Sequence, residues 1–233
     1  MGLRLEGEAA LEMTKLFLTD YGLNIKEESE WKTDYFPDFE REVDGLSQAE
    51  RGYVIPFGDG PRPMYERNVG KSVILNLLAS ATEYAYITTP YLIVDNELCA
   101  AIENAALRGV RVQIVVPHIP DKKLVFEVTK SFYKRFLDAG VEIYEYEPGF
   151  VHAKTYLVDG KYAMVGTINL DYRSLVHHFE NGVWLYRCDC IREIEADMED
   201  TLAKSIKIGK EGDKPNLFKR ILRSVVRIFA SLL

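Results

Sequence analysis

The chain has 233 residues, of which 47% are hydrophobic and 28% charged. That composition excludes a wholly disordered, collagenous or coiled-coil protein and predicts a folded domain with a sizeable core. The formal net charge of −7 disfavours a protein that holds nucleic acid through its overall electrostatic field.

The first fifty residues predict an isolated helix followed by a connector. Residues 3–20 are typical of a short strand or turn and then an amphipathic helix. The acidic start does not resemble a secretory signal, and nowhere do 18 apolar residues run together, so we expect no export signal and no membrane span. Residues 26–52 are rich in acidic residues without a steady period, which predicts an acidic connector.

From Tyr53 to about residue 208 the chain alternates predicted strands and helices, which indicates an α/β domain with helices covering a central sheet. Gly109 and Gly140 stand where helices end in a left-handed residue. Asp159-Gly160 is a strong two-residue hairpin signal. We expect helices at 68–81, 96–108, 122–139 and 191–205, and strands at 84–89, 110–116, 141–146, 152–158, 162–167 and 182–186.

The C-terminal segment differs from the rest, since Lys214–Leu233 carries five basic residues and no acidic one. On a helix, Lys219, Arg223 and Arg227 would fall on one face and apolar side chains on the other. This pattern suits an anionic membrane surface, and it also fits a terminal helix packed on its own domain. We favour the membrane slightly.

The residues that carry chemistry begin at His152-Ala-Lys154. Because side chains on a strand repeat every two residues, the imidazole and the ammonium are predicted to share one face. Such a pair suits a phosphodiester: the imidazole attacks phosphorus or protonates a leaving oxygen, and the ammonium stabilises the charge on the non-bridging oxygens. Asn169, after Gly166 and Thr167, is expected to donate its amide to the same oxygens. No metal or other cofactor is required.

Two carboxylates complete this prediction. Glu180 is expected to hold the second nitrogen of His152, as an imidazole in this role requires. Asp159 belongs to the catalytic motif by its spacing, but its place at a hairpin turn favours shaping the loop over touching substrate. His118, His177 and His178 are assigned to packing or to the surface.

These residues resemble the phospholipase D superfamily, whose signature is HxK-x4-D-x6-G-[ST]-x-N, and within it the bacterial cardiolipin synthases. Thr89-Pro90-Tyr91, Gly149–Lys154 and Asn169–Ser174 carry the closer likeness. The resemblance implies a phospholipase D-like α/β/α sandwich with a mixed central sheet plus a C-terminal amphipathic helix. It divides the chain into a remnant of a preceding half (1–25), the acidic connector (26–52), the catalytic domain (53–208) and the basic tail (209–233).

The resemblance also implies a phosphatidyltransferase that makes cardiolipin and glycerol from two phosphatidylglycerols through a phosphatidyl-histidine intermediate. The first-motif histidine is usually the nucleophile in this family, so His152 is expected to act as general acid and base, with Lys154 and Asn169 clamping the phosphate. Only one HxK motif is present. The other HxK motif that the reaction needs would come from a missing first half or from a second copy of the chain, and a monomer alone is expected to be inactive.

Phosphatidylglycerol and an anionic membrane surface are the expected partners, at the cytoplasmic side of the cell membrane, and no nucleic acid is expected. Two alternatives remain. One is a homodimeric nuclease or phospholipase of the same superfamily, and the other is a catalytically silent half-domain that binds membranes through its tail.

Overall fold

The computed structural model describes residues 2–25 and 52–209, together with Arg223 and Val226. The helices are α1 (Glu8–Ile25), α2 (Val69–Ser80), α3 (Asn96–Leu107), α4 (Lys123–Asp138), the π-helix η2 (Arg173–His177) and α5 (Cys190–Ala203). The strands are β1 (Tyr53–Asp59), β2 (Tyr84–Thr88), β3 (Leu92–Ile93), β4 (Arg111–Pro117), β5 (Glu142–Tyr146), β6 (Thr155–Val158), β7 (Tyr162–Gly166), β8 (Leu170–Asp171), β9 (Glu180–Tyr186) and β10 (Ser205–Lys207).

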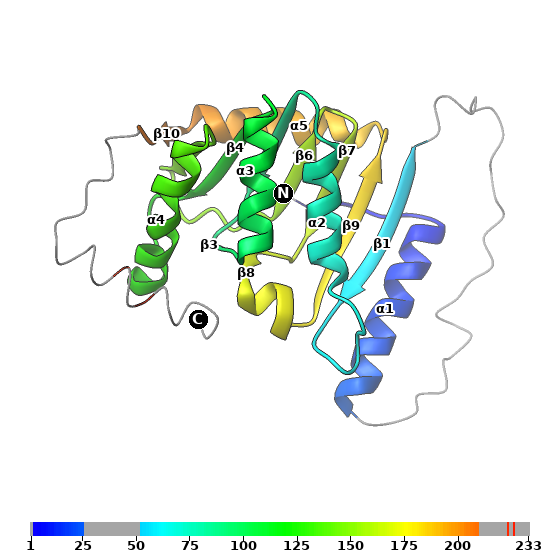
Figure 1. Ribbon diagram of the computed structural model, residues 1–233. Coiled ribbons are helices and arrows are strands. Elements are labelled where there is room, and N and C mark those ends of the chain that lie inside the picture. The colour runs from blue at the N-terminus through cyan, green and yellow to red at the C-terminus, as the bar shows by residue number, and fades with distance from the viewer. Residues whose placement is uncertain (1, 26–51, 210–222, 224–225, 227–233) are drawn as a thin grey trace.

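Eight strands form one mixed sheet in the order β1-β9-β7-β6-β2-β4-β5-β10 (Figure 1). The neighbours β2, β4 and β5 are parallel, and α3 and α4 make the crossovers that parallel strands need. All other neighbours in this sheet are antiparallel. A separate pair, β3 and β8, is parallel. The α/β prediction with a mixed central sheet is confirmed.

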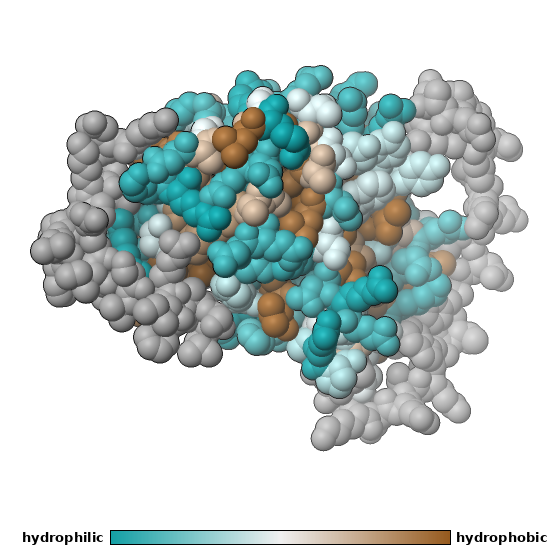
Figure 2. All heavy atoms as spheres, in the orientation of Figure 1, coloured by the Kyte–Doolittle hydropathy of each residue, from teal (hydrophilic) through white to brown (hydrophobic). Residues whose placement is uncertain are grey.

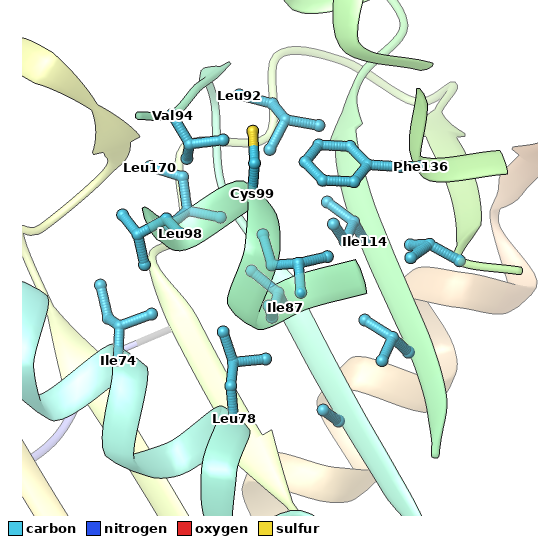
Figure 3. Close-up of a cluster of buried hydrophobic side chains, with 14 of the residues drawn as sticks. Ile74, Leu78, Ile87, Leu92, Val94, Leu98, Cys99, Ile114, Phe136 and Leu170 are labelled. Atoms are coloured by element: carbon cyan, nitrogen blue, oxygen red, sulfur yellow. The ribbon is translucent and has the colours of Figure 1, made fainter. Parts of the chain in front are cut away.

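Helices cover both faces of the sheet, because each strand alternates its side chains between two cores. On β2, Ala85 and Ile87 point to the core shared with α2, α3 and α4, whereas Tyr86 points to the core shared with α5. Figure 3 shows Ile74 of α2 and Leu98 of α3 packed over Ile87 in the first core. The outer surface of these helices is largely hydrophilic (Figure 2).

Local sequence signals set the ends of the elements, and those at Gly109, Gly140 and Asp159-Gly160 were predicted. The side chain of Asp95 caps α3 by accepting a hydrogen bond from the backbone N–H of Leu98 at 2.9 Å. Gly109 and Gly140 follow α3 and α4 with φ values of 94° and 95°. Asp159 and Gly160 have φ values of 53° and 58°, as a tight hairpin between β6 and β7 requires.

Some elements differ from the expectation. β6 starts at Thr155, so His152 precedes the strand, and residues 3–6 form no strand before α1. β9 begins at Glu180, because its first residues pair with the last residues of β1. The pair β3–β8, the helix η2 and the edge strand β10 are too short to show a periodicity in the sequence.

The connector prediction falls on residues outside the described part, apart from Gly52. Of the basic tail beyond Gly209, the structure describes Arg223 and Val226, so the predicted amphipathic helix is not tested. Arg223, predicted to share one helix face with Lys219 and Arg227, is buried and pairs with Glu127 of α4 at 2.8 Å. No helix in the described ranges is long and apolar enough to cross a bilayer.

Candidate active site

Five segments of the chain meet at one edge of the sheet, the edge where the parallel strands end. The carboxyl ends of β2, β4 and β5 lead there into the loops at 89–95, 118–122 and 147–154. The segment 167–179, which includes η2, and the loop 60–68 reach the same edge because β7 and β1 also end there (Figure 1, lower side). Parallel strands that end together bring distant loops into one site.

Lys154 lies buried at this edge, just before β6. Its ammonium donates a hydrogen bond to the carbonyl oxygen of His152 at 2.6 Å, and this is its one hydrogen bond among the described residues. Two N–H groups therefore remain for a ligand. Burial lowers the pKa of Lys154 to about 8, against the opposing charges of Glu180 and Asp171. A buried, incompletely bonded cation is a ready site for an anion.

His152 is exposed beside this lysine. Its ring stacks on the ring of Phe150, with centroids 5.7 Å apart. Partial burial and the ammonium of Lys154 lower the pKa of His152, and the charge of Asp121 opposes them. The neutral imidazole is therefore favoured near neutral pH, the form that accepts a proton or attacks an electrophile.

Asn169 follows β7 and carries one of the two buried side-chain oxygens, with Thr155 Oγ1, that lack a partner in the described part of the chain. Its backbone N–H donates to Ser174 Oγ at 3.1 Å. Ser174 Oγ in turn donates to Glu180 Oε1 at 2.5 Å, and Ser174 N donates to Asp171 Oδ1 at 2.8 Å. The backbone around Asn169 is thus held firmly while its side-chain amide is left for a ligand.

A cavity of about 260 Å³ opens next to Asn169. Its other polar lining residues are Tyr91, Lys122, Asp171, Arg173 and His178, and its apolar ones are Ile93 and Val125. Neither Lys122 nor Arg173 forms an ion pair within the described ranges, so the cavity offers two cations beside the motif.

Glu180 is buried at this edge but does not hold His152 as predicted. It accepts the hydrogen bond of Ser174 and pairs with His178 Nδ1 at 3.6 Å, and no hydrogen bond joins it to His152 among the described residues. The reason is its position on β9, which turns its carboxylate toward η2. The assignment of His178 to packing or surface was therefore incomplete.

Asp159 is not brought to the site. It lies at the other end of β6, where its two carboxylate oxygens accept four hydrogen bonds of 2.8–2.9 Å from Thr82, Glu83 and Tyr84. Burial alone would raise the pKa of Asp159, but these hydrogen bonds outweigh it and hold the pKa below its usual value. The structure therefore places Asp159 away from His152 and Lys154, and its hydrogen bonds fit the expected role of shaping the turn.

Asp121 was not predicted as a site residue, and Tyr91 was named only for the family likeness of Thr89-Pro90-Tyr91. The Tyr91 hydroxyl donates to Asp121 Oδ2 at 2.5 Å, and the Tyr91 ring lies 6.4 Å from that of Phe150, which stacks on His152. A signal was available, because the loop carrying Asp121 follows a predicted strand, and that strand comes next along the chain after the strand before Tyr91.

Within the described residues, no three His, Cys, Asp or Glu side chains gather as a metal site.

Comparison with protein families gives one match, since residues 74–202 fit the model described as "Cardiolipin synthase, PLD-like domain". Among curated proteins, the chain is 36% identical over 232 residues to "Cardiolipin synthase 2" of Bacillus cereus, which covers 99% of the chain and 44% of that protein. It is 41% identical to an uncharacterized protein of Streptococcus mutans, over 98% of the chain and 48% of that protein. The chain thus spans about half the length of these curated relatives.

Among solved structures, the fold is similar to a phosphatidylserine synthase from Haemophilus influenzae, with a TM-score of 0.64 and 19% identity over 80% of this chain and 48% of that one. It is also similar to Nuc, a phospholipase D family member from Salmonella typhimurium, with a TM-score of 0.57 and 16% identity over 67% of this chain and 98% of that one. At these identities the likeness concerns the fold.

Proposed function

The chain belongs to the cardiolipin synthase family of phospholipase D-like domains, a family of phosphatidyltransferases, and on that basis we propose that it supplies one of two HxK motifs for the transfer of a phosphatidyl group between two phosphatidylglycerols. Cardiolipin and glycerol are the products. One observation carries the proposal: His152, Lys154 and Asn169 lie at one edge of the sheet with hydrogen-bonding groups that other described residues leave wholly or partly unused.

Two of these residues would bind the reacting phosphate. The two free N–H groups of Lys154 suit the non-bridging oxygens, where negative charge grows as phosphorus is attacked. Asn169 Nδ2 makes no hydrogen bond within the described residues and is a second donor for those oxygens. Because Lys154 is buried, its charge acts in a medium of low dielectric constant and is worth more than an exposed lysine.

His152 would move protons in two steps. The histidine of the other HxK motif, which this chain does not carry, attacks phosphorus, and His152 gives a proton to the departing glycerol oxygen as the P–O bond breaks. His152 then takes a proton from the incoming hydroxyl, which attacks phosphorus and breaks the P–N bond of the phosphatidyl-histidine. A bound phosphodiester anion would offset the ammonium of Lys154 and raise the pKa of His152, which suits a group that must hold a proton in one step and release it in the next.

The cavity beside Asn169 would receive the headgroup of the acceptor. Its two cations, Lys122 and Arg173, suit the second phosphate that an acceptor phosphatidylglycerol brings, and a neutral alcohol would not need them. Glu180 would keep Lys154 protonated, since its negative charge opposes the effect of burial on the pKa of that lysine.

Cardiolipin formation from phosphatidylglycerol as the sole lipid tests the proposal, followed by mass spectrometry over a range of chain concentrations. If two copies complete the site, the specific activity rises with concentration and falls when inactive His152→Ala chains are mixed in. If a missing first half completes it, activity appears only in the longer protein. Robust transfer by a monomer of this chain would contradict the single-motif role, and cleavage of plasmid DNA without lipid transfer would favour the nuclease alternative.

A further inference from the structure

Exposed apolar side chains gather around the edge that holds His152. Loops and first helical turns from different parts of the chain contribute them, and each is between 37% and 54% exposed. We call them the apolar rim: Met64 after β1, Ile119 after β4, Leu124 in the first turn of α4, Phe150 before β6, and Val176 in η2. Figure 2 shows hydrophobic side chains reaching the surface at the lower margin, in the region of β8 and η2.

The rim surrounds the site. Phe150 stacks on His152 itself. Val176 shares a hollow with Arg62, which lies two residues from Met64, and Phe150 shares another with Lys122, which lies between Ile119 and Leu124. Other exposed apolar residues of the described ranges lie on α1, on the edge strands β1 and β10, or, like Leu107, at the far end of α3. Single exposed apolar residues are ordinary, but a ring of them around a site indicates a partner.

Cations are interspersed with this rim. The segments 60–68, 118–124, 147–152 and 172–179 contain five lysines and arginines, none of which forms an ion pair within the described residues: Arg62, Arg67, Lys122, Lys123 and Arg173. The same segments contain three acids, Glu66, Asp121 and Glu147. These exposed groups carry a net charge of +2 on a chain whose formal charge is −7, and the further acids Asp59, Asp171 and Glu180 of this edge are buried.

From this juxtaposition we propose that the apolar rim and its cations dock this edge of the domain onto an anionic lipid bilayer, with the rim side chains in the interface and His152 at headgroup level. Apolar side chains flanked by lysine and arginine are what an anionic bilayer surface attracts. The inference rests on the proposed function, because a lipid substrate must pass from the bilayer to His152. It concerns a different surface from the basic tail at 209–233.

Vesicle binding by the full chain tests the docking without any need for turnover. Ile119→Ser with Leu124→Ser removes two rim side chains that line none of the cavities described above, and Leu107→Ser, at the opposite end of α3, is the matched control. Flotation with phosphatidylglycerol vesicles should show the double variant binding at least ~10-fold more weakly, since burying the exposed halves of these two side chains is together worth roughly tenfold or more in affinity. The control should bind like the wild type, and neutral phosphatidylcholine vesicles should bind all three weakly.

Tryptophan fluorescence gives an independent measurement of vesicle docking. Ile119→Trp should shift its emission to shorter wavelength on phosphatidylglycerol vesicles, and Leu107→Trp should not. Equal binding of the double variant and the wild type would overturn the proposal, as would tighter binding to duplex DNA than to the vesicles. Rim-dependent binding by a chain that makes no cardiolipin in any assembly would leave the docking surface standing and refute the proposed function alone.

Discussion

The two ends of β6 hold different parts of the HxK-x4-D motif, and they differ in how fully the protein satisfies their hydrogen-bonding groups. At one end Asp159 is fully satisfied, with four hydrogen bonds to the segment before β2. At the other end Lys154 is buried with two unused N–H groups, and His152 has no hydrogen bond from its ring among the described residues. The four residues of β6, Thr155–Val158, are the spacer between them.

This difference separates stability from function within one motif. A carboxylate whose oxygens are all bonded by the protein has nothing left for a ligand, whereas a buried ammonium with free donors costs folding free energy that only a bound anion returns. The motif therefore holds a strand in place at one end and exposes reactive groups at the other. Substitution of Asp159 should therefore mainly lower stability, and substitution of His152 should mainly lower activity.

The largest effect is expected for His152→Ala, in an assembly that supplies the second HxK motif. Loss of a proton-transfer group should slow cardiolipin formation by ~10³-fold or more. The side chain is exposed, so the free energy of unfolding should change by less than about 0.5 kcal/mol. Transfer rates and urea unfolding measure the two quantities. A variant that loses stability and activity together would remove the contrast between the two ends.

The free-energy cost of burying the charged Lys154 should appear in the pH dependence of the unfolding free energy. Its pKa is about 8 in the folded protein and its ordinary value is 10.5. Between these values the folded protein binds fewer protons than the unfolded chain, so the unfolding free energy rises with pH in this window. Relative to Lys154→Met, the wild type should gain about 3 kcal/mol between pH 8 and 10.5. Urea unfolding at several pH values checks this, and parallel curves for the two proteins would refute it.

Asp159→Asn should act on stability alone. Asparagine tolerates the left-handed backbone at this position and removes only the charge and part of the acceptor capacity. We expect a loss of about 1–2 kcal/mol at neutral pH. Because the folded-state pKa of Asp159 is lowered, the wild-type advantage should be present above pH ~4 and vanish as pH falls through that pKa. Turnover per folded molecule should equal that of the wild type.

The sequence predicted well what depends on regular periods and on single chemical signals. The parallel core of β2, β4 and β5 followed from alternating strands and helices closed by Gly109 and Gly140. His152, Lys154 and Asn169 followed from their spacing, and the hairpin at Asp159-Gly160 from the turn chemistry. Each of these depends on residues close together in the chain.

Features that depend on contacts between residues far apart in the chain could not be predicted from the sequence. The direction of the Glu180 carboxylate depends on the pairing of β9 with β1, whose Asp59 lies opposite it in the register. The pair β3–β8 and the helix η2 are too short to leave a pattern, although they bring Asp171 and Arg173 to the cavity. The place of Asp121 beside His152 requires knowing which loops share an edge of the sheet.

The smallest expected effect concerns Asp121, the carboxylate that was not predicted. The charge of Asp121 raises the pKa of His152, against burial and Lys154, which lower it. Asp121→Asn should therefore lower the pKa further, and only slightly because the histidine is exposed to solvent. Lys154→Met should shift it in the opposite direction. Proton NMR titration measures both shifts, with the His152 signal assigned by its absence in His152→Ala. A pKa that responds to Glu180→Gln but not to Asp121→Asn would return the role to the carboxylate first expected from the sequence, and the reactive end of β6 would then be tuned from β9 rather than from the loop after β4.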